Sequence, residues 1–109
     1  MADEIYEMSP VELDERLRGD APPVLLDVRE PWEHGVASIP GNRLVPLNSL
    51  PAALSTLDPA REYVIYCHHG TRSLLAAQFL KARGIQRVSN LHGGIAAWSD
   101  EVDPSVPQY

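Results

Sequence analysis

One short segment of the chain concentrates the side chains that could do chemistry. It runs Cys67, His68, His69, Gly70, Thr71, Arg72 and Ser73, and it holds the only cysteine of the sequence. The cysteine follows an apolar run that ends at Tyr66, and a helical pattern begins at Ser73, so it stands at the carboxyl end of a strand, where open α/β sheets bind ligands. The positive end of a helix dipole stabilises a thiolate. The segment therefore predicts a nucleophilic cysteine that needs no dedicated base.

The rest of the segment supplies groups that bind anions. Gly70 permits the tight curvature in which successive backbone N–H groups point inward, and Thr71 and Ser73 add hydroxyl donors. Arg72 carries a permanent charge and a planar fork of donors, with which it either binds a substrate anion or ties the loop to a carboxylate. We favour the second role for Arg72. The segment fits a small anionic substrate.

The two histidines leave several roles open. His68 and His69 either contact the substrate or only line the rim of the site. A metal site formed with Cys67 is disfavoured, because three consecutive residues in a tight loop seldom converge on one ion and the chain has no second cysteine. We therefore expect neither a metal nor another cofactor.

The elements that position this segment follow from apolar runs separated by Gly and Pro. Two runs, 24–28 and 63–66, are apolar without alternation, which is typical of central parallel strands covered on both faces. Weaker strand patterns occupy 5–8, 43–45 and 88–91. Helical patterns occupy 10–18, which Ser9 caps, 31–35, 49–54 and 73–83, and the last is expected to be mostly buried. This alternation of strands and helices predicts an α/β fold.

Length and composition restrict the possible classes of protein. The 109 residues are expected to form a single domain, 1–109, with an acidic, proline-containing tail from about 100 to 109. The acidic side chains of this tail, Asp100, Glu101 and Asp103, are expected to be solvated. A net charge of −6 without a basic cluster argues against nucleic-acid binding. No apolar run is long enough to span a bilayer, and the acidic residues Asp3 and Glu4 do not fit a secretory signal. We therefore expect a cytoplasmic protein that does not bind a membrane.

Four segments together resemble the rhodanese family of sulfurtransferases. They are CHHGTRS at 67–73 after the strand pattern YVIY, LLDVREPWEHG at 25–35, IPG at 39–41 and LHGGIAAW at 91–98, and they span nearly the whole chain. The resemblance implies a three-layer α/β/α fold with a mainly parallel five-stranded sheet between helices. It also implies that Cys67 attacks the outer sulfur of a donor such as thiosulfate and forms a persulfide. An acceptor then takes the sulfur, which is cyanide in vitro and a thiol or a protein in the cell.

The same resemblance implies roles for residues around the nucleophile. The backbone amides of 68–73 cradle the thiolate or the persulfide. Three residues of the LLDVREPWEHG segment support the loop without touching the substrate: Asp27, Arg29 and Glu33. Glu33 or Asp27 is the expected carboxylate partner of Arg72.

Two features outside the loop lie just before the IPG segment and within the LHGGIAAW segment. Ala37 and Ser38 stand where many members of the family have Gly-His, so the hydrogen bond of that histidine is absent here or is made by Ser38. In the LHGGIAAW segment, Gly93 and Gly94 are expected to form a turn into the last helix, and His92 is expected to be packed rather than catalytic.

Three other functions stay open at this point. Cysteine phosphatases and arsenate reductases of related fold use a similar thiolate and arginine, but they typically have five residues between the two, where this chain has four. A second possibility is a non-catalytic binding or regulatory module of this fold, a role that such domains adopt when the cysteine is lost. A third possibility is that Cys67 relays sulfur to a specific protein partner. The loop length and the intact cysteine favour a sulfurtransferase.

Overall fold

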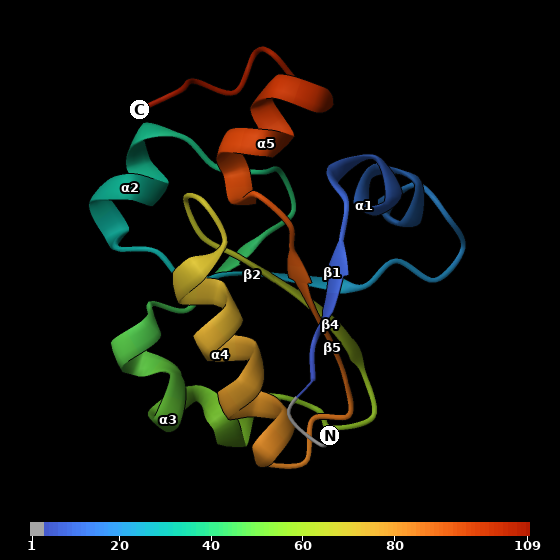
Figure 1. Cartoon of the computed structure of the whole chain (residues 1–109). Coiled ribbons are helices and arrows are strands. Elements are labelled where there is room, and N and C mark those ends of the chain that lie inside the picture. Colours follow the sequence, from blue (N-terminus) through green and yellow to red (C-terminus); the bar gives the residue numbers. More distant parts are fainter. Residues whose placement is uncertain (1–3) are drawn as a thin grey trace.

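A parallel sheet of five strands lies between two layers of helices in the computed structural model, which describes residues 4–109 (Figure 1). The strands lie in the order β1 (Tyr6–Met8), β5 (Arg87–Leu91), β4 (Glu62–Tyr66), β2 (Val24–Asp27) and β3 (Arg43–Leu44), and every neighbouring pair is parallel. The predicted α/β fold and its five-stranded sheet are confirmed. Asp3, which we counted with the acidic N-terminus, lies outside the described residues.

Helices cover both faces of this sheet (Figure 1). The core on one face contains side chains of α1 (Pro10–Leu17) and α5 (Gly94–Glu101), and the core on the other contains side chains of α4 (Thr71–Ala82) and the short α3 (Leu50–Ala53). Helix α2 (Pro31–Val36) follows β2 at the carboxyl end of the sheet. Within residues 4–109, no helix is both long and apolar enough to cross a lipid bilayer.

The central strand β4 is apolar without alternation because both of its faces are covered. Tyr63 and Ile65 pack in the core that contains α4, whereas Val64 and Tyr66 pack in the core that contains α5. All four side chains are buried. Strand β2 is also interior, as the sequence predicts for both runs.

Strand β5 lies in the interior of the sheet too, although its sequence predicts a strand less strongly. Val88 and Leu91 are buried, but Ser89 and Asn90 interrupt the apolar run and are buried as well. Because buried polar groups need hydrogen-bond partners, the amide of Asn90 must be matched by polar groups nearby. For Asn90 those partners belong to the candidate active site.

The starts of α1 and α4 show where the sequence predicts helix boundaries well and where it does not. The hydroxyl of Ser9 accepts the N–H of Glu12 at 3.1 Å and caps α1, as predicted. Helix α4 begins at Thr71 rather than Ser73. The reason is that Gly70, with a left-handed φ of 106°, is the N-cap residue, and the chain is helical from the next residue on.

Helix α4 is also less buried than its apolar composition predicts. Leu75 is 56% exposed, because α4 has the sheet on one side only. The buried side chains of its middle turns are Ala76, Ala77 and Leu80.

Residues 102–109 pack against the protein, and of the acidic residues expected to be solvated, Asp100 and Glu101 are exposed and Asp103 is partly exposed. Val106 is buried in the same core as α5, and its carbonyl accepts the hydroxyl of Ser99 at 2.7 Å. The side-chain amide of Gln108 donates to Asp100 at 2.9 Å. These contacts bring Tyr109 beside α2 (Figure 1).

Candidate active site

Cys67 directly follows β4, and its sulfur lies among donors from the start of α4. The residue is buried, with 1% of its surface exposed. Its Sγ accepts the N–H of Gly70 at 3.1 Å, the N–H of Ser73 at 3.4 Å and the hydroxyl of Ser73 at 3.3 Å. The first four N–H groups of a helix have no partner within it, and Gly70 and Ser73 direct two of these to the sulfur. The other two belong to Thr71 and Arg72.

Asn90 of β5 holds this active-site loop (residues 67–73) from the neighbouring strand, and the sequence did not predict it. Its Nδ2 donates to the carbonyl of Gly70 at 3.1 Å and to both carboxylate oxygens of Glu7 at 3.0 and 3.1 Å. Its Oδ1 accepts the hydroxyl of Ser73 at 2.5 Å. A hydroxyl has one hydrogen, so Ser73 can donate to Asn90 or to the Cys67 sulfur but not to both at once. A buried Asn within a strand is the one sequence signal that could have pointed to this residue.

An open cavity of about 480 Å³ borders the loop on the side of β1 and β5. Its walls include His69, Thr71 and His92. His92 was predicted to be packed, but it is exposed, and its Nδ1 lies 3.3 Å from Glu7 Oε1. The prediction was wrong because the chain leaves the sheet directly after β5, where the side chain meets solvent.

The N-terminus of α5 holds the first part of the loop. The N–H of Ile95 donates to the carbonyl of Cys67 at 2.9 Å, and the N–H of Ala96 donates to the carbonyl of His68 at 3.1 Å. Gly94 has a φ of +64°, and a Cβ at this position would lie 2.4 Å from the His68 carbonyl oxygen. This glycine therefore permits the close approach of α5 to the loop, in addition to the predicted turn.

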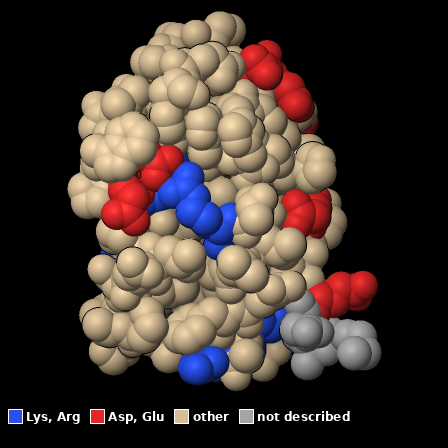
Figure 2. Space-filling view, turned by 60° about the vertical axis from the view of Figure 1, so that its left-hand side comes forward, with Lys and Arg blue, Asp and Glu red and all other residues tan. Residues whose placement is uncertain are grey.

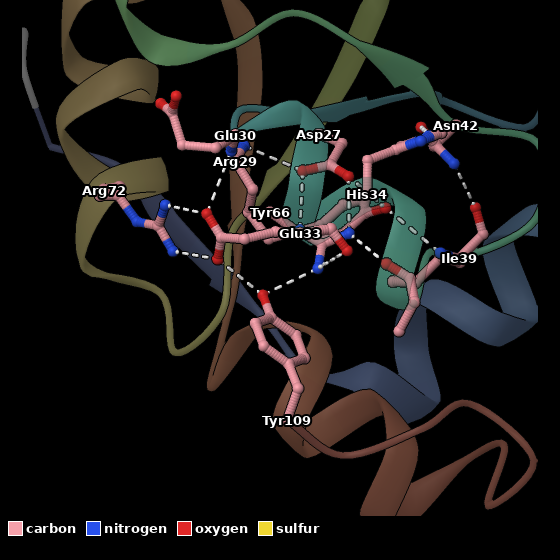
Figure 3. Close-up of polar contacts among 11 residues, drawn as sticks. Asp27, Arg29, Glu30, Glu33, His34, Ile39, Asn42, Tyr66, Arg72 and Tyr109 are labelled. Carbon is pink, nitrogen blue, oxygen red and sulfur yellow. Dashed lines mark hydrogen bonds and ion pairs between the residues drawn. The ribbon is translucent and has the colours of Figure 1, made fainter.

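Arg72 is tied to Glu33 of α2, one of the two carboxylates that the sequence offered. Its Nη1 and Nη2 donate to Oε1 and Oε2 at 2.6 and 2.9 Å (Figure 3). Hydrogen bonds from Arg72 lower the pKa of Glu33 to about 2, although burial opposes this shift. The same hydrogen bonds raise the pKa of Arg72. The first turn of α4 is thus fixed to α2 by a two-point ion pair.

Asp27, the other candidate, pairs with Arg29 instead, and both are fully buried. Arg29 donates from Nε and Nη2 to the two carboxylate oxygens of Asp27 at 2.9 and 2.7 Å (Figure 3). Its remaining N–H groups donate to the carbonyls of Ala37 and Glu33 and to the hydroxyl of Tyr109. All five guanidinium N–H groups therefore have acceptors. Burial alone would lower the pKa of Arg29, but the hydrogen bonds to Asp27 and Tyr109 raise it.

The two histidines stack on each other at the start of the loop. The rings of His68 and His69 have centroids 4.0 Å apart. The ring of His68 also stacks on the ring of Tyr109, with centroids 4.0 Å apart and an angle of 9° between the ring planes. Burial and the neighbouring His69 lower the pKa of His68. Tyr109 was not predicted, because no spacing in the sequence connects it to the loop.

The structure thus brings the predicted residues together in two groups. Residues 67–73 and Glu33 meet at the active-site loop. Asp27 and Arg29 lie behind Glu33 and contact that group through the Glu33 carbonyl and Tyr109.

The combination of a parallel α/β sheet, a cysteine at a strand end and an arginine-tied loop agrees with the match of residues 9–101 to the family described as Rhodanese-like domain. The chain belongs to the rhodanese-like domain family. One similar member is the putative sulfurtransferase YtwF of Bacillus subtilis (strain 168), which is 36% identical over 101 residues, or 93% of this chain and 97% of that protein. The crystal structure of a rhodanese-like domain protein from Staphylococcus aureus is similar with a TM-score of 0.83 at 28% identity, over 96% of this chain and 99% of that one.

Other similar members of the family are much longer than this chain. Rhodanese-like/PpiC domain-containing protein 12, chloroplastic, of Arabidopsis thaliana is 42% identical over 89 residues, which are 78% of this chain and 30% of that protein. The adenylyltransferase and sulfurtransferase uba4 of Ogataea parapolymorpha is 35% identical over 97 residues, which are 87% of this chain and 25% of that protein. Rhodanese-like domains therefore occur in proteins of very different length.

Substitution of Gly94 by alanine tests the close approach of α5 to the loop. We expect Gly94→Ala to lower the free energy of unfolding by about 2 to 5 kcal/mol, because strain at a left-handed φ adds to a clash with the loop carbonyls. The matched control is Gly84→Ala, which has a φ of +97° and open space around its Cβ, so it measures strain alone, about 1 to 2 kcal/mol. Urea unfolding measures both, and equal losses would contradict the role of Gly94.

The dependence of the free energy of unfolding on pH, below pH 4.5, tests the Arg72–Glu33 pair. The pKa of Glu33 is about 2 in the folded protein and its ordinary value is 4.5, so between these pH values the unfolded state binds more protons and stability falls as the pH falls. At neutral pH, Glu33→Gln is expected to cost about 2 to 3 kcal/mol, after allowance for the partial exposure of Arg72. In urea unfolding, this difference from the native protein should shrink as the pH is lowered from 4.5 towards 2.

The control for this series is Glu101→Gln, at an exposed position on α5, which should change stability by less than about 0.5 kcal/mol. A difference between native protein and Glu33→Gln that stays constant down to pH 2 would show that the pair does not stabilise the fold in this way.

Proposed function

We propose that the chain is a sulfurtransferase that holds sulfane sulfur as a persulfide on Cys67. The observation that carries the proposal is the position of Cys67 Sγ, 3.1 Å from the Gly70 nitrogen and 3.4 Å from the Ser73 nitrogen at the start of α4. Such donors stabilise a sulfur anion, which is the form of both the attacking thiolate and the persulfide. The sulfurtransferase name of the similar Bacillus subtilis protein supports the same activity.

The proposed reaction consists of two displacements. The thiolate of Cys67 attacks the outer sulfur of thiosulfate, a new S–S bond forms, the S–S bond of thiosulfate breaks, and sulfite leaves with the electron pair. The persulfide then carries one negative charge beside the same amides. An acceptor anion such as cyanide or a thiolate attacks the terminal sulfur, and Cys67 leaves as a thiolate ready for the next cycle.

The pairing of Arg72 favours sulfur transfer over phosphoryl transfer. A phosphatase of this type needs its arginine for the phosphate oxygens, whereas both Nη atoms of Arg72 donate to Glu33. The four residues between Cys67 and Arg72 also make a smaller loop than the five typical of those enzymes. A sulfur anion held by the backbone N–H groups of Gly70 and Ser73 and by the Ser73 hydroxyl, without the arginine, fits this arrangement.

A thiol or a protein is the acceptor that we propose in the cell. The similar protein uba4 is named both adenylyltransferase and sulfurtransferase, which is consistent with transfer of sulfur to a protein acceptor.

The surface near the loop also suits a protein partner. On the face turned forward in Figure 2, a few acidic and basic side chains lie side by side and most of the surface is uncharged. Trp32 is 65% exposed and lies against the Tyr109 ring beside the loop. Such a surface suits contact with another protein better than contact with nucleic acid, which needs a basic patch.

Intact mass after thiosulfate treatment tests the proposed activity. We expect the native protein to gain one sulfur atom and cyanide to remove it as thiocyanate. Cys67→Ser should gain none, because a serine hydroxyl is a much weaker nucleophile than a thiolate. Circular dichroism of the variant confirms that the protein is still folded.

Hydrolysis of p-nitrophenyl phosphate is the parallel assay for the phosphoryl alternative. We expect the native protein to show no more hydrolysis than Cys67→Ser. Hydrolysis that depends on Cys67, or a native protein that forms no sulfur adduct, would each overturn the proposal.

A further inference from the structure

Tyr109 makes four contacts beside the active-site loop, from a segment outside the family match, which ends at residue 101. Its hydroxyl donates to Glu33 Oε2 at 2.7 Å and accepts Arg29 Nη1 at 2.8 Å (Figure 3). Its ring stacks on His68 with centroids 4.0 Å apart, and Trp32 meets it edge-on with centroids 6.1 Å apart. The residue is held there by the buried Val106 three positions earlier.

These contacts reach both ends of the active-site loop. His68 directly follows the nucleophile, so the ring of Tyr109 rests on the start of the loop. Glu33 binds Arg72 in the first turn of α4, so the hydroxyl of Tyr109 fixes the carboxylate that holds the end of the loop. One side chain thereby restrains the two sides of the site that contains Cys67.

We propose that Tyr109 is a positioning residue of the sulfurtransferase site, which orients His68 through its ring and the Glu33–Arg72 pair through its hydroxyl. It acts through these neighbours and touches neither Cys67 nor the transferred sulfur. The proposal rests on the proposed function for the meaning of the site, but its contacts can be tested without any sulfur donor.

Two substitutions separate the ring of Tyr109 from its hydroxyl. Tyr109→Phe keeps the stacking on His68 and removes both hydrogen bonds, which leaves one N–H of the buried Arg29 without an acceptor. Tyr109→Ala removes the ring as well. Gln108→Ala is the matched control, because this exposed side chain is bonded to Asp100 and not to the site.

The expected results differ among the three variants. Tyr109→Phe should lower the Tm by about 4 to 8 °C and slow persulfide formation by about 2- to 4-fold, measured by mass after short exposures to thiosulfate at 20 °C, because the Glu33–Arg72 pair loses the hydroxyl that orients it. Tyr109→Ala should lower the Tm at least as much and slow persulfide formation by about 10-fold, because the loop loses its orientation. Gln108→Ala should match the native protein in rate.

The titration of His68, followed by NMR, is the readout that a merely structural anchor would not move. Burial, together with His69, Arg72 and Arg29, lowers the pKa of His68, while Glu33 raises it. Removal of the Tyr109 ring exposes the imidazole, so the pKa should rise towards 6.5 in Tyr109→Ala and stay near its native value in Tyr109→Phe.

Two results would overturn the proposal. If Tyr109→Ala keeps both the native rate and the native His68 titration, Tyr109 is only an anchor of its segment. If Tyr109→Ala forms the persulfide faster than the native protein and iodoacetamide alkylates Cys67 faster, Tyr109 is a cover that obstructs the site. A native protein that forms no persulfide refutes the proposed function instead, and the His68 titration then decides the positioning role.

Discussion

The buried ion pair of Arg29 and Asp27 is the interaction on which the rest of the site depends. Two charges with no exposed surface are costly to remove from water unless every donor and acceptor finds a partner. Arg29 meets this condition with acceptors from α2, from the carbonyl of Ala37 and from Tyr109, while Asp27 also accepts the hydroxyl of Tyr66 from β4. Satisfying one guanidinium therefore fixes several segments at the carboxyl edge of the sheet.

From this pair, polar contacts continue outward to the nucleophile. The hydroxyl of Tyr109 joins Arg29 to Glu33, and Glu33 holds Arg72 in the first turn of α4, next to the Ser73 N–H that donates to the sulfur. On the opposite side, Asn90 bonds both the Gly70 carbonyl and a serine hydroxyl of the loop. Each contact joins different elements, so the geometry around the sulfur is a result of the whole fold rather than of the loop sequence.

This dependence on the whole fold explains what the sequence could and could not predict. The apolar runs identify the interior strands β2 and β4, and the position of Cys67 after β4 predicts that this residue is the nucleophile of the proposed reaction. The partner of Arg72 was limited to two carboxylates, but the choice of Glu33 depends on where α2 lies and on the other carboxylate being occupied. Asn90 and Tyr109 were missed, because a polar residue in a strand and one far along the chain reach the loop only through tertiary packing.

The loop after β4 is held by two helices at once. Helix α4 directs its first N–H groups to the sulfur, and α5 bonds the carbonyls of Cys67 and His68 at a distance that Gly94 permits. An inserted residue would have to displace one of these helices or break the pairing of Arg72. The distance along the chain from cysteine to arginine is therefore constrained by the scaffold, and an evolutionary change of the proposed transfer from sulfur to phosphate would have to alter a helix position or the Arg72–Glu33 pair together with the loop.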